Sequence, residues 1–593
     1  MMIYLLSLTM LAVLFSSTAQ AQTDQPNVVV VLVDDAALMD FGVYGGEAAT
    51  PNIDALADRG MIFQQHRATP FCAPSRAMLL TGMDHHLAGF GTIAEVLPRE
   101  HRGQPGYMMK LEPGVETIAT KLKRAGYRTY MTGKWHMGHG EGELPVDHGF
   151  DRSFILDASG ADHWEDKPYL PYYKDAPWFE DGREAELPDD YYSSTFIAEK
   201  MQDYLEADQD RPEPFFAYVA FLAIHIPVQA PRAYTEKYID AYQDGWNAVR
   251  NQRWQRAQEL GLVRNGAPLA DQPETIPRWE ELSLEEQKLA AKSLAVNAGA
   301  LEAMDKELGD LIAYLKDSGQ FENTIFVVTS DNGPEAGDGW GSPAQFWFDL
   351  VGYTRDYETL GEKRSFVAIG PGGASAAAGP NHLFKFHAGE GGLRVPLIIA
   401  GPGLPERQTI SSFTIMADIA PTLIDLVNID DTAPADAKQM TGRSLLPLIR
   451  GETDAVYGPD DAVGFSTSGQ AALYRGRYKL VRNLPPFGDS VWRLFDLEDD
   501  PGETRDLSND LPELKAELML DYGDYADRMG VLELPEGYEV VQQISSNTME
   551  RMLGFYWHWI VLTVIIVLAL IATSIWLLWK LIARFTPLGG RSG

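Results

Sequence analysis

Val28-Val29-Val30-Val31-Leu32-Val33 is followed directly by Asp34-Asp35. A continuous apolar run rich in β-branched residues is typical of a strand that is buried on both faces, in the middle of a parallel sheet. The two carboxylates stand at the carboxyl end of this strand, which is where ligands bind in open α/β sheets. The stretch therefore predicts an α/β fold and one edge of a binding site.

Two later runs have the same form. Residues 215–221 lead toward His225, and residues 324–330 end in Asp331-Asn332-Gly333. Helical patterns alternate with the strands, at 51–57, 117–124, 197–205 and 294–315. This alternation continues to about residue 445 and predicts a doubly wound mixed sheet in a domain over residues 26–450.

The pattern changes after residue 450. Residues 472–481 and 492–496 alternate between apolar and polar, as antiparallel strands do, and a helix is expected over 512–525. We expect a small α+β domain at 451–530 and a linker at 531–553. Within the first domain, the Gly/Ala-rich residues 370–379 predict a loop, and the polar residues 234–288 predict an insertion over the site.

Both ends of the chain carry apolar segments. Residues 3–15 are mostly apolar and precede an Ala-x-Ala pattern that ends at Ala21, which predicts a signal peptide at 1–21, with an uncleaved anchor as the alternative. Residues 554–579 contain no Asp, Glu, Lys or Arg and exceed the ~20 residues that a membrane helix needs.

Aromatic residues stand at both ends of the C-terminal segment, which favours a membrane helix over a buried core helix. The basic residues Lys580, Arg584 and Arg591 follow it and predict a cytoplasmic tail at 580–593. A chain with a single cysteine is more typical of a bacterial periplasmic protein than of a secreted domain stabilised by disulfides. The expected location is the bacterial inner membrane, with a single span and the catalytic domain in the periplasm.

Composition excludes two classes of protein. Apolar residues make up 45% of the 593 residues, so the chain is not globally disordered. The formal net charge is −35, which argues against a nucleic-acid partner. An anionic substrate is repelled by the chain as a whole, so its site has to concentrate positive charge locally.

The only cysteine, Cys72, lies in Phe71-Cys72-Ala73-Pro74-Ser75-Arg76. It can form no disulfide within its chain, and the plain alternative is a small buried apolar side chain. Pro74 and Ser75 favour the start of a helix, and Gly82 is expected to end it. Cys72 is therefore expected just before the N-terminus of this helix, where free backbone N–H groups attract anions. Arg76 adds a cation whose guanidinium can bind one oxyanion through two of its nitrogens. Together, Cys72, the helix N-terminus and Arg76 suggest chemistry on a sulfate or a phosphate.

Four oxygen-bearing side chains follow strands: Asp34, Asp35, Asp331 and Asn332. Oxygen-only sets suit Ca²⁺ or Mg²⁺, and the sequence has no His/Cys cluster with zinc spacing. A single pair of this kind is more often a turn or a helix cap than a metal site. Two pairs in one predicted sheet favour metal binding.

These motifs resemble those of the sulfatases, in the alkaline-phosphatase-like superfamily. The resemblance rests on Cys72-x-Pro74-Ser75-Arg76 with Thr81-Gly82, on Gly133-Lys134-Trp135-His136, on His225-x-Pro227, and on Lys385 ahead of Glu390-Gly391-Gly392. It extends from about residue 26 to residue 525 and is greatest to bacterial arylsulfatases.

The resemblance implies a chemistry. Cys72 would be oxidised by a maturation enzyme to formylglycine, whose hydrate attacks sulfur. The implied metal ligands are Asp34, Asp35, Cys72, Asp331 and Asn332. Calcium is the usual metal, and Mg²⁺ or Mn²⁺ also suits these ligands.

Further roles are implied for the basic residues. Lys134 would contact the nucleophile and the sulfate, and His136 would orient the formylglycine hydroxyl and take its proton. His225 and Lys385 would contact the sulfate and help to protonate the leaving oxygen. His85, His86, His139 and His387 lie outside these motifs and are not expected to be catalytic.

The expected function is hydrolysis of small-molecule sulfate esters, with aryl sulfates favoured. One alternative is a phosphonate monoester hydrolase or phosphodiesterase of the same superfamily. The other is a catalytically silent protein that binds sulfated ligands.

Overall fold

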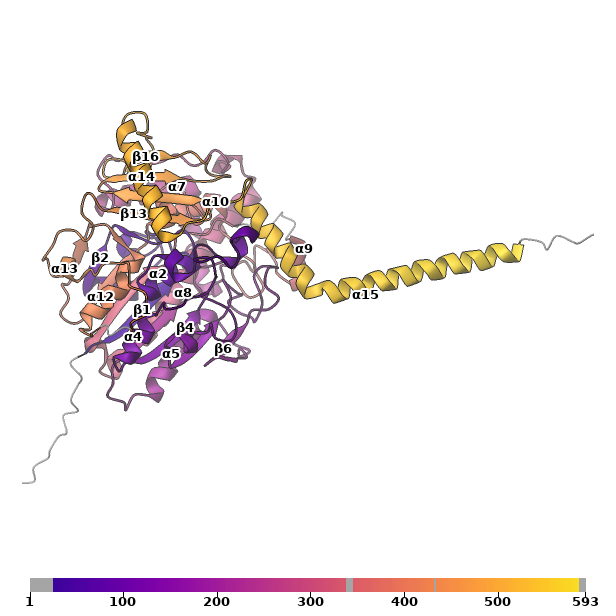
Figure 1. The fold of residues 1–593 in the computed structure, drawn as a ribbon, viewed down its shortest axis with the longest axis horizontal. Helices are drawn as coiled ribbons and strands as arrows, with labels where there is room; N and C mark the ends of the chain where they lie inside the picture. Colours follow the sequence, from indigo (N-terminus) through magenta and orange to yellow (C-terminus); the bar gives the residue numbers. More distant parts are fainter. Residues whose placement is uncertain (1–24, 338–344, 431–433, 586–593) are drawn as a thin grey trace, which may run out of the picture.

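The computed structural model describes residues 25–337, 345–430 and 434–585 (Figure 1). The predicted signal peptide, 1–21, and the end of the predicted tail, which includes Arg591, lie outside these residues.

A ten-stranded mixed sheet forms the centre of the molecule. The order of its strands is β11 (Gln408–Ile410), β2 (Gly60–Phe63), β10 (Leu397–Ala400), β9 (Thr324–Ser330), β1 (Asn27–Val33), β8 (Phe215–Ala220), β4 (Arg128–Lys134), β5 (Arg152–Leu156), β6 (Trp178–Glu180) and β7 (Arg183–Glu184). The five strands from β9 to β5 are parallel, whereas β10 runs antiparallel to both β9 and β2. The register pairs Val33 with Ser330, so the residues after β1 and after β9 lie side by side.

Helices cover both faces of this sheet, which confirms the doubly wound prediction. Val29, Val31 and Val33 of β1 belong to one core, with α1 (Pro51–Asp58), α5 (Ser193–Ala207) and α8 (Leu284–Asp317). The alternate residues of β1 belong to a second core, with α2 (Cys72–Thr81), α4 (Ile118–Arg124) and α12 (Ile419–Leu426). Because both faces are buried, β1 needs the unbroken apolar run that its sequence shows.

The prediction of a loop at residues 370–379 is wrong, because Gly370–Ala378 forms helix α10. Its second half is rich in alanine, the best helix former. Its glycines allow close packing, since a Cβ on Gly372 would lie 2.6 Å from the Trp246 ring. The predicted insertion contains α7 (Trp246–Glu259), which packs against α10, and Arg253 of α7 pairs with Asp40 at 2.9 Å.

The C-terminal α+β unit follows as expected. Strands β13 (Ala462–Thr467), β14 (Gln470–Arg475), β15 (Tyr478–Arg482) and β16 (Arg493–Asp496) form an antiparallel sheet in chain order. Helix α14 (Pro512–Met529) packs on it and runs one turn beyond the predicted end.

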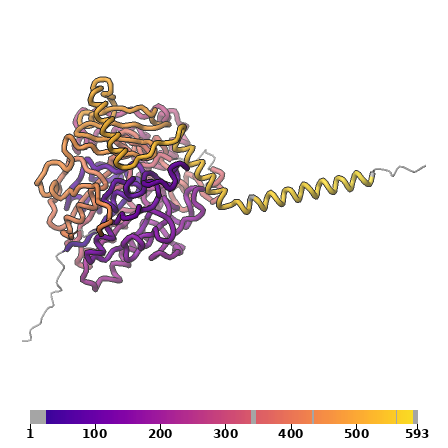
Figure 2. The backbone as a smooth tube through the Cα atoms, in the orientation of Figure 1, coloured from indigo at the N-terminus to yellow at the C-terminus, as the bar shows by residue number. Residues whose placement is uncertain are grey.

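Helix α15 (Val540–Phe585) ends the described chain with 46 residues. Its first turns lie within the predicted linker, 531–553, and contact the catalytic body, whereas the rest projects away from it (Figures 1 and 2). Val561–Arg584 is long and apolar enough to cross a membrane, with a mean hydropathy of 2.8, and none of it is buried. The predicted span, 554–579, overlaps this segment within the same helix.

Candidate active site at the carboxyl ends of the central strands

The helix that carries Cys72 starts at Cys72 itself, before the expected start at Pro74 and Ser75. Cys72 is the first residue of α2, and Phe71 before it is extended, with φ −144° and ψ 143°. The helix ends at Gly82, which is left-handed with φ 65°. The Ser75 hydroxyl accepts a hydrogen bond from the N–H of Thr69 at 3.0 Å. This bond connects the segment that precedes Cys72 to the first turn of the helix. Cys72 thus lies in the first turn, beside the free N–H groups.

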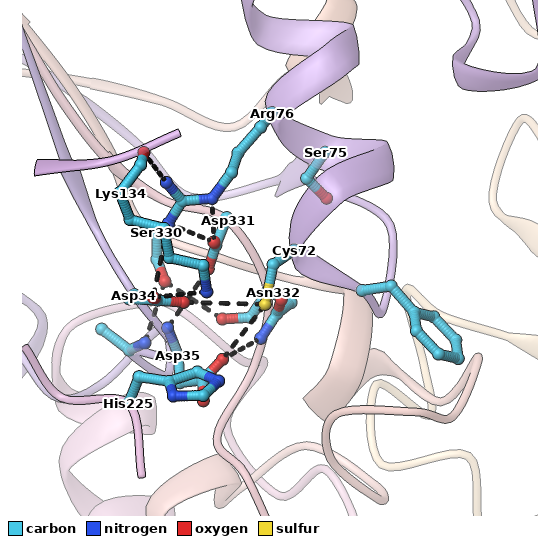
Figure 3. A network of polar contacts seen from close by, with 12 residues as sticks. Asp34, Asp35, Cys72, Ser75, Arg76, Lys134, His225, Ser330, Asp331 and Asn332 are labelled. Carbon is cyan, nitrogen blue, oxygen red and sulfur yellow. Dashed lines mark hydrogen bonds and ion pairs between the residues drawn. The ribbon is translucent and has the colours of Figure 1, made fainter. Parts of the chain in front are cut away.

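The five predicted metal ligands converge (Figure 3). The Cys72 Sγ lies 3.6 Å from Asp34 Oδ1 and 3.9 Å from Asp35 Oδ1. Asn332 Nδ2 donates to Asp35 Oδ1 at 2.7 Å, and the Asp35 N–H donates to Asp331 Oδ1 at 3.2 Å. All five side chains are buried.

Each of the three aspartates has its own cation. Lys134, the last residue of β4, places Nζ 2.6 Å from Asp34 Oδ2, and Lys385 places Nζ 2.8 Å from Asp35 Oδ1. Arg76 donates through Nε to Asp331 Oδ2 at 2.9 Å, and its Nη2 lies 2.8 Å from the same oxygen. Arg76 is fully buried in this pairing and holds Asp331 in place, and its Nη2 has no hydrogen-bond partner among the described residues. The oxyanion contact expected of Arg76 stays a prediction.

The cations do not balance the aspartates equally. Burial, and then the charge of Asp331, raises the pKa of Asp34 to about 7. Burial also raises the pKa of Asp35, against the charge of Lys385. Burial acts in the same direction on Asp331, but Arg76 and Lys134 outweigh it and lower its pKa. Negative charge on Asp34 and Asp35 is therefore under-compensated, and a bound cation would relieve it.

The two predicted histidines are neutral here. His136 lies just after β4 with a positive φ of 54°, and burial, followed by the charge of Lys134, places its pKa well below the ordinary value. His136 Nδ1 is buried with no hydrogen-bond partner among the described residues. Burial and the same lysine also lower the pKa of His225.

His225 is oriented by its own loop. Its Nδ1 lies 2.7 Å from the Ile226 carbonyl oxygen, which can only accept, so Nδ1 carries the hydrogen. Nε2 is left as an acceptor, 3.9 Å from Asp35 Oδ2.

The donor set fits a hard divalent cation. Asn332 Oδ1 is buried without a hydrogen-bond partner among the described residues, although an isolated buried carbonyl oxygen is costly. Carboxylates and this amide oxygen are the ligand types that Ca²⁺ prefers. Asp34, Asp35, Asp331, Asn332 and the position of Cys72 would hold such an ion.

Three site residues were not expected from the sequence. Glu335 Oε2 lies 3.0 Å from Lys385 Nζ, and the Tyr169 ring meets the His225 ring edge-on at 5.1 Å. Ser330 Oγ accepts the N–H of Ala36 at 2.9 Å and donates to the Asn332 carbonyl at 3.0 Å, which joins the ends of β1 and β9. Only Ser330 gives a sequence signal, as the polar residue that ends a buried run.

The segment that carries Lys385 is brought in by a close backbone contact. The Gly333 N–H donates to the Gly392 carbonyl at 3.1 Å, and a Cβ on Gly333 would lie 1.8 Å from the Gly391 oxygen. Only glycine fits there, which explains the glycines in both motifs.

The four histidines left out of the catalytic set have other partners. His85 Nδ1 lies 2.8 Å from the Phe90 carbonyl, and His86 Nδ1 lies 3.1 Å from Asp84 Oδ1. His139 Nδ1 contacts Asp157 at 2.8 Å, and His387 Nδ1 lies 3.0 Å from the Lys385 carbonyl. These contacts orient loops around the site, and none of them is made to Cys72.

Comparison with known proteins identifies the family. The sulfatase family model matches residues 26–429, and the model of the N-sulphoglucosamine sulphohydrolase C-terminal region matches residues 384–521. The arylsulfatase of Klebsiella aerogenes is 35% identical over 440 residues, which cover 72% of this chain and 91% of that protein. An uncharacterised sulfatase of Schizosaccharomyces pombe is 33% identical over 543 residues, which cover 88% of this chain and 96% of that protein.

Solved structures share the fold. The crystal structure of Ps i-CgsB in complex with k-i-k-neocarrahexaose has a TM-score of 0.60 and 21% identity, and covers 89% of this chain and 97% of its own. BT4656 in complex with D-glucosamine-2-N,6-O-disulfate has a TM-score of 0.55 and 20% identity, covering 86% and 100%. The matched sulfatase model spans both the strand-end carboxylates and the Cys72 helix, and this chain belongs to the sulfatase family.

Proposed function

We propose that this sulfuric ester hydrolase acts on aryl sulfates, with Cys72 converted to formylglycine as its nucleophile and with calcium as its metal. The observation that carries the proposal is the position of Cys72, in the first turn of α2 and 3.6 Å from a strand-end aspartate. The similarity to the Klebsiella arylsulfatase supports the aryl class.

An unmodified thiol suits this place poorly. Burial raises the pKa of Cys72 well above its ordinary value, against the charges of Lys134 and Lys385. The thiolate is the reactive form of cysteine, so the buried thiol is a weak nucleophile. When present, the metal supplies Lewis-acid polarisation of a sulfate oxygen, and the formylglycine hydrate supplies an oxygen nucleophile.

The lysines bind the negative charge of the ester. Lys134 pairs with Asp34 and Lys385 pairs with Asp35, and both lysines are buried. Burial acts to lower the pKa of Lys385, but Asp35, Cys72 and Glu335 outweigh it and raise that pKa, so the ammonium stays charged. Buried cations stabilise charge that builds on sulfuryl and leaving oxygens.

The histidines handle protons at defined atoms. The free Nδ1 of His136 can accept a proton from the nucleophile hydroxyl. His225 carries its hydrogen at Nδ1, so it gives a proton to the leaving oxygen only after Nε2 is protonated. A bound anionic sulfate favours that protonation.

The membrane helix and the periplasmic location belong to the same proposal. Val561–Arg584 would anchor the catalytic body, and the maturation enzyme would act on Cys72 before folding buries it. Truncation after Phe555 is expected to release an active soluble protein.

Matched aryl substrates test the reaction class. We expect kcat/KM for 4-nitrophenyl sulfate to exceed that for 4-nitrophenyl phenylphosphonate, and Cys72→Ala to abolish turnover of both. A phosphonate preference would favour the alternative hydrolase. Binding of sulfate esters without any turnover by protein purified from its own host would favour the silent binder.

A further inference from the structure

The first part of α15 is fixed to the catalytic body. Asn547 is buried, and its Nδ2 donates to the carbonyl oxygens of Glu95 and Leu97 at 2.9 and 3.0 Å. Glu550 pairs with Arg102 at 3.0 Å, and Arg551 Nη2 donates to the Tyr172 hydroxyl at 3.2 Å. These contacts set the position of the helix before it reaches the apolar span.

A cavity of about 720 Å³ lies between this part of α15 and the body. Its apolar wall includes Leu97, Met108, Met109, Tyr172 and Phe555, of which Phe555 comes from α15. Methionine side chains adapt to varied apolar ligands.

Charged side chains of both signs line the cavity. Arg102, Lys110 and Arg551 line it together with Glu143 and Glu550, and Lys110 lies 3.0 Å from Glu143. The three cations exceed the two carboxylates by one, so the cavity is more favourable to an anionic ester than the rest of a protein whose net charge is −35.

A series of side-chain contacts connects Tyr172, which lines the cavity, with His225 in the active site. Tyr172 meets Tyr173 edge-on at 5.0 Å, and the Tyr173 hydroxyl donates to Ser159 Oγ at 2.9 Å. Ser159 Oγ lies 2.7 Å from the hydroxyl of Tyr169, whose ring contacts His225. His139, which also lines the cavity, follows His136 by three residues.

One wall of the cavity leads to the membrane helix. Phe555 precedes Val561, where the apolar span begins, by six residues, or about 9 Å of helix. Between them Trp557 and Trp559 are exposed, as interfacial aromatic residues are. The cavity therefore lies near the level of the membrane surface if α15 spans the bilayer.

We propose that this cavity binds the apolar body of an amphiphilic sulfate ester that is drawn from the membrane surface, while its sulfate enters the site at Cys72. The inference rests on the proposed function and narrows its substrate class. Phe555 and Met108 are specificity-determining residues, and α15 forms part of the substrate site as well as the anchor.

The test uses the full-length protein in lipid nanodiscs with two esters, 4-nitrophenyl sulfate and a long-chain alkyl derivative of it, whose nitrophenol leaving groups differ only in the alkyl chain. We expect kcat/KM to be at least about tenfold higher for the alkyl derivative. Phe555→Ala and Met108→Ala should each lower this ratio about tenfold, because each removes apolar contact with the chain. Leu553→Ala is the matched control, since Leu553 is exposed on the same helix and does not line the cavity.

Equal kcat/KM values for the two esters, or a ratio that Phe555→Ala leaves unchanged, would overturn the inference. Failure of the proposed function looks different, because the wild-type protein would then hydrolyse neither ester.

Discussion

Two clusters of buried charge differ in how well they are satisfied. The site cluster consists of Asp34, Asp35, Asp331, Arg76, Lys134 and Lys385. The interface cluster joins the C-terminal domain to the catalytic domain and consists of Arg67, Glu390, Lys479 and Glu503. Lys479 Nζ lies 2.9 Å from Glu390 and 2.8 Å from Glu503, and Arg67 lies 2.7 Å from Glu390.

Burial is equally complete in the two clusters, but its effect differs between individual carboxyl groups. It prevails at Glu503 in the interface cluster and raises its pKa, and it is outweighed at Asp331 in the site cluster, whose pKa is lowered. Burial acts to raise the pKa of Glu390, but Arg67 and Lys479 outweigh it and lower that pKa.

At Asp34 in the site cluster, burial prevails and raises the pKa to about 7. In the interface cluster every member is ion-paired with another member. The site cluster keeps a carboxyl group, Asp34, whose charge is costly to bury, beside an Asn332 oxygen that has no hydrogen-bond partner among the described residues, and so is organised for a ligand.

Asp34→Asn gives the largest expected effect on activity. The substitution keeps the size of the side chain and removes one metal-ligand charge, so we expect kcat/KM to fall by at least about 10²-fold. Since the Asp34 charge is costly to bury, the free energy of unfolding in chelator should change by no more than about 1 kcal/mol. Aryl sulfate kinetics and urea unfolding measure the two effects. A large stability loss with little loss of activity would place Asp34 with the interface cluster instead.

Lys479→Met should reverse this pattern. The lysine is fully buried, and its loss leaves Glu390 and Glu503 uncompensated, which costs about 3–5 kcal/mol of unfolding free energy. Activity per folded molecule should stay within about threefold of wild type, because Lys479 does not contact the site cluster.

Lys174→Met is the control for Lys479→Met, since Lys174 is an exposed lysine whose pairing contributes little. Equal denaturation midpoints for the two variants would contradict the account of the interface cluster.

Calcium should distinguish the clusters by thermal stability. A ligand that binds only the native state stabilises it by about 2.7 kcal/mol at a hundredfold excess over Kd. We expect calcium to raise the Tm of wild type and of Lys479→Met, and to have little effect on Asp34→Asn. A calcium shift of full size in Asp34→Asn would remove Asp34 from the ligand set.

The last prediction concerns the pH dependence of stability through His66, next to Arg67. Burial, and then the charge of Arg67, lowers the pKa of His66 to about 3, from an ordinary 6.5. Between these values the unfolded chain binds a proton that the native state does not. This contribution to stability is complete above pH 6.5 and is lost as the pH falls toward 3, at up to about 1.4 kcal/mol per pH unit.

His66→Asn should therefore flatten the pH dependence of the unfolding free energy between pH 6.5 and pH 4, measured by urea unfolding. An unchanged slope would show that His66 does not titrate in this way.

The sequence predicted the parts of the fold that a local pattern determines. The run before Asp34 and the run before Asp331 are apolar because both faces of β1 and β9 are buried, so strand positions and strand-end carboxylates could be located together. Helix α10 was mistaken for a loop because its glycines serve packing against Trp246, which is distant in sequence.

The candidate site was located from motifs, but its pairings were not. Arg76 was expected to bind an oxyanion, and only the folded sheet shows that its Nε also donates a hydrogen bond to Asp331. Glu335 and Tyr169 were missed because their roles arise from contacts with Lys385 and His225 across the fold. The cavity beside α15 depends on how a helix docks, which no periodicity reveals.

The most direct test is mass spectrometry of the tryptic peptide 68–76 from protein made in its own host. The account predicts formylglycine at position 72, at an occupancy that tracks sulfatase activity across preparations. Fully active protein with an unmodified Cys72 would contradict it.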